Sequence, residues 1–263
     1  MTLIHQFAFY LHVTFGACAL LLFWVPVFTR KGNTDHKRFG RIFASAMYAV
    51  SASGATMASL DLIAPLAMHA TTINPADPQA PLAAGQIRAS AMFLFSLSVL
   101  VFTSTRQGWL AIIHKADRQP LRHPLHLGLC GLLIAVGVIL FITGLRVGSV
   151  LFMVFALLEI ASGVGRLRYN LKSELNTKEW WIEHLNGLIG SGIGAYTAFF
   201  VFGGSRLLSD LFGNAFANGS LFLWLAPGVI GSIAIAVLSR KYRARFNGGW
   251  VMKRAALHSD LVR

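Results

Sequence analysis

Charge and cysteine are both scarce in this chain of 263 residues. Charged residues make up 13% of the sequence and hydrophobic residues 55%, whereas a typical soluble domain carries roughly 25% charged residues. A soluble fold of this size needs more charged residues than this to cover its surface. The composition therefore excludes an ordinary soluble domain. The long apolar segments instead predict helices that cross a membrane.

The two cysteines, Cys18 and Cys130, each lie inside an apolar segment. They form no CxxC motif, and two isolated cysteines do not make a disulfide framework. The Walker, GxSxG and HExxH motifs are absent as well, which removes the common nucleotide-binding, serine hydrolase and zinc protease classes. The last apolar segment has no lysine, so a retinal Schiff base is excluded there.

Seven segments are long enough to cross a bilayer, which needs about 20 mostly apolar residues. The predicted spans are residues 3–28, 39–60, 87–113, 124–145, 147–164, 180–201 and 221–238. The sequence therefore predicts an all-α, polytopic transmembrane bundle that forms a single domain over residues 1–263. The first span is expected to be retained rather than cleaved, because no Lys or Arg precedes Cys18 and apolar residues follow it.

The 23 basic residues outnumber the 10 acidic ones and give a net charge of +13. They form short clusters between the apolar segments rather than a basic arm, a pattern that favours anionic lipid over nucleic acid. Three loops and the tail hold all of them except Arg88, Arg146 and Arg206. Because basic loops stay in the cytoplasm, this alternation predicts seven spans with the N-terminus outside and the C-terminus inside. The expected location is a bacterial inner membrane.

Ionisable side chains inside spans are costly and usually functional. Five of them are expected near the cytoplasmic ends of the helices, and they are His36, His126, Glu159, Glu183 and His184. His126 and His184 lie at matched depths, and Glu159 is expected to reach the same layer if the fourth, fifth and sixth helices are neighbours. Imidazole and carboxylate ligands suit zinc, iron or copper, and two histidines suit axial ligation of a haem b.

Both of these interpretations have a structural alternative. A histidine near a helix end often bonds a loop carbonyl, and a buried glutamate needs either an internal partner or a proton. We therefore predict His126, His184 and His36 as metal or haem ligands, and Glu159 and Glu183 as proton- or ion-coupling groups.

A second polar cluster is expected near the outer face, formed by His12, Asp61 and Arg88. Asp61 and Arg88 lie where the second and third spans meet the outer surface, so they are expected to form an ion pair that supports folding. The alternative places His12 with Asp61 in an outer proton-accepting site.

Motifs at both ends of the chain resemble a family of uncharacterised bacterial multi-pass membrane proteins, a domain of unknown function. The matching residues are His12 with Gly16, His36-Lys37-Arg38-Phe39-Gly40-Arg41, and His184 with Thr197-Ala198-Phe199. The resemblance marks His12, His36 and His184 as motif positions. It implies no activity, because the family has none assigned.

The sequence leaves four functions open. The first is a haem- or metal-binding redox or electron-transfer protein, and the second is a proton-coupled transporter of a small solute that uses Glu159. A metal-dependent membrane enzyme and a non-catalytic accessory subunit are the others. Besides the lipid bilayer, the partners left open are a second copy of the chain, another membrane subunit, a quinone and a small solute.

Overall fold

Helices account for all the regular structure in the residues that the computed structural model describes, which are 3–70, 72–203 and 221–260. In chain order the elements are α1 (Leu3–Phe28), α2 (Thr34–Ile63), α3 (Pro65–Met68), α4 (Ala80–His114), the 3-10 turn η1 (Gln119–Leu121), α5 (Pro124–Val147), α6 (Val150–Leu171), α7 (Glu179–Ala198), the π-helical turn η2 (Phe199–Gly203) and α9 (Leu221–Asp260). The predicted all-helical class is confirmed. Arg206 of the predicted outer set lies outside the described residues.

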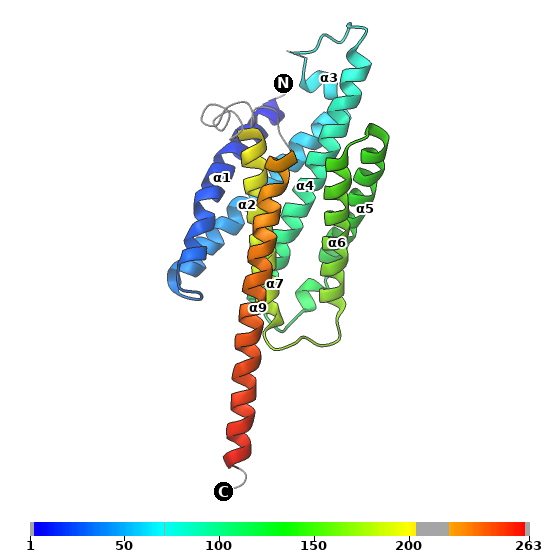
Figure 1. Cartoon of the computed structure of the whole chain (residues 1–263). Helices are drawn as coiled ribbons and strands as arrows, with labels where there is room; N and C mark the ends of the chain where they lie inside the picture. Colours follow the sequence, from blue (N-terminus) through cyan, green and yellow to red (C-terminus); the bar gives the residue numbers. More distant parts are fainter. Residues whose placement is uncertain (1–2, 71, 204–220, 261–263) are drawn as a thin grey trace.

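The long helices stand side by side in one bundle (Figure 1). The α1–α2 hairpin forms one side and the α5–α6 hairpin the other, while α4 and α7 pack against each other between them. Helix α9 packs on α7 and continues well beyond the bundle (Figure 1).

Five of the described helices are long and apolar enough to cross a membrane, namely α1, α4, α5, α6 and the Leu223–Phe246 part of α9. Many of their large apolar side chains are exposed, as lipid-facing side chains would be. Leu21 of α1 is 77% exposed and Ile230 of α9 is 68% exposed. The expectation of a membrane protein is therefore supported.

The two other long helices, α2 and α7, are not among these five candidate spans. α2 has 30 residues and α7 has 20, so both have sufficient length. α2 packs between α1 and α4, and α7 contacts α1, α4 and α9. Polar side chains in membrane helices usually face other helices rather than lipid, and these contacts give the polar residues of α2 and α7 such neighbours.

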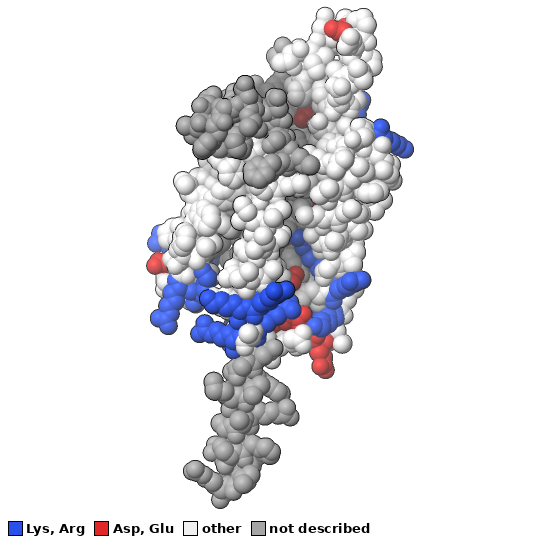
Figure 2. Space-filling view, in the orientation of Figure 1, with Lys and Arg blue, Asp and Glu red and all other residues white. Residues whose placement is uncertain are grey.

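Lysine and arginine gather at one end of the bundle, which we call the basic end (Figure 2). This end holds the α1–α2, α4–α5 and α6–α7 connections, and α9 passes through it. α1 begins at the opposite end (Figure 1).

The fifth predicted span, residues 147–164, is displaced in the structure. Gly148 takes the left-handed conformation with φ 69° and ends α5, and the Ser149 side chain caps α6 by accepting from the N–H of Phe152. α6 then continues to Leu171. Arg166, which the charge pattern placed in a loop, therefore lies within the helix, where its guanidinium finds hydroxyl partners on α4.

The backbones of α4 and α7 touch at a pair of glycines. A Cβ at Gly187 would lie 2.6 Å from the Cα of Gly108, and a Cβ at Gly108 would lie 3.1 Å from the Cα of Gly187. Small residues allow this close approach in a membrane, where packing rather than the hydrophobic effect drives helix association. The contact places the first turns of α7 directly against α4.

We predict that Gly187→Ala destabilises the protein by about 1–3 kcal/mol, the usual effect of forcing an extra methyl group into a packed contact. The measurement is thermal unfolding in mild detergent. Gly190→Ala on the same helix is the matched control, because its Cβ would meet nothing within 4 Å. Equal melting temperatures for the two variants would contradict the close contact.

Candidate functional site

Three side chains of α4 bond three side chains of α6 at a constant offset of 63 residues. The pairs are Ser96 with Glu159, Thr103 with Arg166, and Gln107 with Asn170. Steps of seven and four residues keep three side chains on one helix face. The two helices therefore run parallel and in register, and we call these pairs the α4–α6 ladder.

The first pair of the ladder holds a carboxyl group that is closed off from solvent. The hydroxyl of Ser96 donates to Oε1 of Glu159 at 2.9 Å, and the Glu159 side chain has no exposed surface. Its Oε2 atom is buried without a hydrogen-bond partner. Gly137 on α5 makes room beside it, since a Cβ there would lie 3.3 Å from the Cβ of Glu159.

The second pair brings a guanidinium group into the bundle. Arg166 donates from Nη1 to the hydroxyl of Thr103 and from Nη2 to the hydroxyl of Ser104. The described residues give Arg166 no carboxylate within ion-pair distance, so hydroxyl dipoles stabilise its charge.

The third pair is the centre of a wider network around Gln107, which is 1% exposed. Its Nε2 donates to Oδ1 of Asn170 and to Oε1 of Glu183, each at 2.9 Å. Its Oε1 lies 2.7 Å from Nε2 of His126. Because a carbonyl oxygen can only accept, Nε2 of His126 carries the proton and Nδ1, which is buried without a partner, has the lone pair.

His36 and His184 face each other at the basic end. Their ring centres are 6.5 Å apart with the ring planes at 76°. Nδ1 of His184 lies 3.0 Å from the carbonyl oxygen of Gly108, and Nδ1 of His36 lies 3.1 Å from that of Pro26. Each Nδ1 therefore donates, which leaves both Nε2 lone pairs available to a ligand. Burial lowers the pKa of His36, which precedes the predicted span, and Lys31 and Lys37 lower it further against the opposing effect of the Pro26 carbonyl.

Glu159 lies outside the predicted layer of His126 and His184, which contact the adjacent residues Gln107 and Gly108 of α4. His184 faces His36, while the Nε2 atom of His126 is occupied by Gln107. Glu159 bonds Ser96, which lies 11 residues from Gln107 and therefore roughly 16 Å away along α4. Across the described ranges, no three His, Cys, Asp or Glu side chains come together as a metal-binding set.

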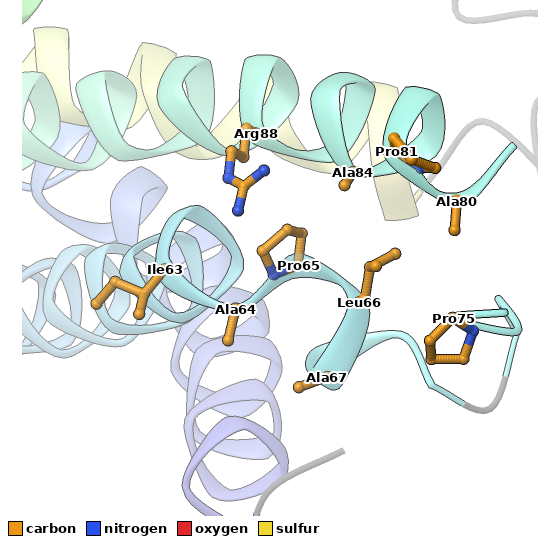
Figure 3. A pocket seen from close by; sticks show the side chains of 10 residues that line it. All are labelled: Ile63, Ala64, Pro65, Leu66, Ala67, Pro75, Ala80, Pro81, Ala84 and Arg88. Atoms are coloured by element: carbon orange, nitrogen blue, oxygen red, sulfur yellow. The ribbon is translucent and has the colours of Figure 1, made fainter. Parts of the chain in front are cut away.

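The predicted outer cluster is also corrected. Oδ1 of Asp61 lies 3.6 Å from Nε2 of His5 and 3.3 Å from Nε2 of His69, whereas the expected Asp61–Arg88 pair is not formed. Arg88 donates from Nε to the carbonyl of Leu62, at the negative end of the α2 dipole. Its side chain points toward Pro65 across a groove between α3 and α4 (Figure 3).

His12, the third member of that cluster, lies deeper in the bundle. Its Nδ1 is 2.9 Å from the carbonyl of Val50 and 3.2 Å from the hydroxyl of Ser53. Sequence reasoning missed His5, although His5 and His12 are seven residues apart and so lie on one face of α1. That spacing was the available signal.

Two arginines of the α4–α5 connection also had a role that the sequence did not reveal. Arg118 donates to the carbonyls of Lys172 and Ser173, and Arg122 donates to those of Asn170 and Lys172. These contacts satisfy carbonyls in the last turn of α6 and in the two residues that follow it. Arg118 and Arg122 therefore hold the α4–α5 connection against the end of α6, next to Asn170 of the ladder. They also contribute two positive charges to the basic end.

Comparison of the chain with protein-family models, with curated proteins and with solved structures gave no match. The resemblance at His12, His36 and His184 therefore stays a prediction.

Proposed function

We propose that this chain crosses a bacterial inner membrane seven times, with the N-terminus outside and the C-terminus in the cytoplasm. Five helices with sufficient length and hydropathy support this proposal. The position of α2 and α7 among those helices supports two further spans. The gathering of positive charge at the basic end favours the orientation (Figure 2).

Single cysteines in a background without Cys18 and Cys130 test this topology. We predict that Ala76→Cys, in the connection between α3 and α4, reacts with a membrane-impermeant maleimide in intact cells. Glu174→Cys, in the α6–α7 connection, should react only after the cells are opened. Both side chains are exposed in the structure, so the reverse labelling pattern would refute the orientation.

We further propose that the protein is a proton-coupled carrier of a small solute and that Glu159 is the group that binds and releases the proton. The observation that carries this proposal is the environment of its carboxyl group, which has one hydroxyl donor, no exposed surface and no cation within ion-pair distance among the described residues. A carboxyl group in this position needs either a partner or a proton.

The depth of Glu159 fits this role. It lies nine residues after the start of α6 and twelve before its end, or roughly 14 Å and 18 Å from the two ends. If α6 crosses the membrane as proposed, the group is near the middle of the bilayer. At the other end of the α4–α6 ladder, Gln107 donates to Glu183 of α7. We propose Glu183 as the second proton-binding carboxyl group, at the basic end.

Infrared spectroscopy of the protein in lipid tests whether Glu159 binds a proton. We predict a carbonyl stretch from a buried carboxylic acid that disappears at alkaline pH and is absent from Glu159→Gln. The glutamine is close in size and can still accept from Ser96, so the variant should remain folded. Ser96→Ala should shift the band, because its hydrogen bond is lost.

The matched control is Glu174→Gln, which removes an exposed carboxyl group in the α6–α7 connection and should leave the buried band unchanged. A wild-type spectrum identical to that of Glu159→Gln at every pH at which the protein is folded would refute the proton role.

A second function, metal or haem binding for electron transfer, is favoured by the pair His36 and His184. A metal ion bound by two Nε2 atoms can hold the ring centres at most roughly 6.4 Å apart. This distance is the sum of two bonds of about 2 Å and the radii of the two rings. The observed 6.5 Å is close to that value. Backbone carbonyls on Nδ1 orient both rings in the manner of metal-binding histidines. A bound haem b or transition metal would supply redox chemistry there.

We predict that protein purified in mild detergent shows either a Soret band or a stoichiometric transition metal, lost in His36→Asn and in His184→Asn. His114→Asn at the end of α4 is the control and should retain the signal. Measurement requires the visible spectrum and the metal content of the same sample. Absence of both signals from wild-type protein would refute this second function and leave the proton role untouched.

A further inference from the structure

Arg106 differs from Arg118, Arg122 and Arg166 in its lack of partners among the described residues. Arg118, Arg122 and Arg166 all donate to carbonyl or hydroxyl oxygens. Arg106 makes no hydrogen bond or ion pair with any described residue, and its Nε atom is buried. It lies eight residues before the end of α4, roughly 12 Å inside that end. A positive charge at this depth calls for an anion.

The side chain lines a groove of about 540 Å³ at the basic end. Arg106 and Leu110 come from α4, Gln119 and Pro120 from η1, and His123 and Leu125 from the start of α5. Polar groups and apolar side chains thus share one depression. The nearest carboxylate along the chain, Asp117, accepts from the backbone N–H of Gln119 and forms no ion pair with Arg106.

The apolar part of the groove opens toward the outside of the bundle. Leu125 of α5 is 60% exposed. Ile113, one turn after Leu110 on α4, is 49% exposed. In a helix that crosses a membrane, such side chains meet lipid. A ligand that fits this groove therefore has a negative head for Arg106 and a chain that continues along an apolar surface.

We propose that the groove between α4, η1 and α5 binds an acidic phospholipid, with the headgroup phosphate held by Arg106. A guanidinium group matches phosphate oxygens with paired donors. Gln119 supplies a neutral donor, and His123 supplies a ring at the headgroup level. This site lies outside the α4–α6 ladder and the His36–His184 pair, so it goes beyond the proposed function.

Native mass spectrometry of the full chain in detergent tests the site with phosphatidylglycerol and phosphatidylcholine as probes. Wild-type protein should retain phosphatidylglycerol in preference to phosphatidylcholine. Arg106→Gln should lose this preference about ten- to hundredfold, the range expected when one charge-assisted hydrogen bond is removed. Arg106→Lys should retain part of it. Arg168→Gln, which removes an exposed arginine at the same end, is the control and should behave as wild type.

Equal retention of the two lipids by wild-type protein, or unchanged preference in Arg106→Gln, would overturn the proposal. Competition by inorganic phosphate alone would also overturn it, since the site would then be one for soluble anions. If Arg106→Gln does not fold, labelling of wild-type protein decides the question. A phosphatidylglycerol with a photoreactive headgroup should label residues 118–125, and uniform labelling of the basic end would refute the site.

Discussion

The parallel register of α4 and α6 is the constraint on which the polar interior depends. Both helices rise by about 1.5 Å per residue, so two helices in register keep the same offset along their whole contact. The offset of 63 residues recurs at Ser96, Thr103 and Gln107. α5 connects the two helices and packs against both. The chain reverses its direction before α5 and again after it, so α4 and α6 run the same way.

Close packing elsewhere in the bundle makes the polar contacts possible. Gly108 and Gly187 bring α4 and α7 together, and this contact places Glu183 beside Gln107 and His184 beside the Gly108 carbonyl. Hydrogen bonds between membrane helices contribute about 0.6 kcal/mol each on average. The network therefore determines register and side-chain orientation more than it determines stability.

Much of the fold could be predicted from the sequence because membrane helices are defined by length, hydropathy and charge, which are local properties. The limits of α1 were predicted correctly. Arg166 caused the main error in α6, because a basic residue near a helix end gives no sign of whether hydroxyl groups on another helix will accept from it. The turn at Gly148 and Ser149 is a local signal that was available.

The grouping of the site residues could not be predicted in the same way. Depth along a helix places His126 and His184 at one level, but it does not say which neighbour each ring faces. His184 faces His36 because two glycines let α7 approach α4, and that contact joins residues far apart in the sequence. The sequence does not single out Ser96, since serine is common in membrane helices and only its position opposite Glu159 gives it a role.

Solid-state carbon-13 NMR of the protein in lipid tests the proton-binding role of Glu159, because it observes the Glu159 carboxyl group and its neighbour together. We predict a cross-peak between the Glu159 carboxyl carbon and Cβ of Ser96. We also predict that this carboxyl resonance changes from the acid to the carboxylate position as the pH is raised. A carboxyl resonance fixed in one form at every pH at which the protein is folded would contradict the proton role of Glu159. The absence of the Ser96 cross-peak would contradict the contact between α4 and α6.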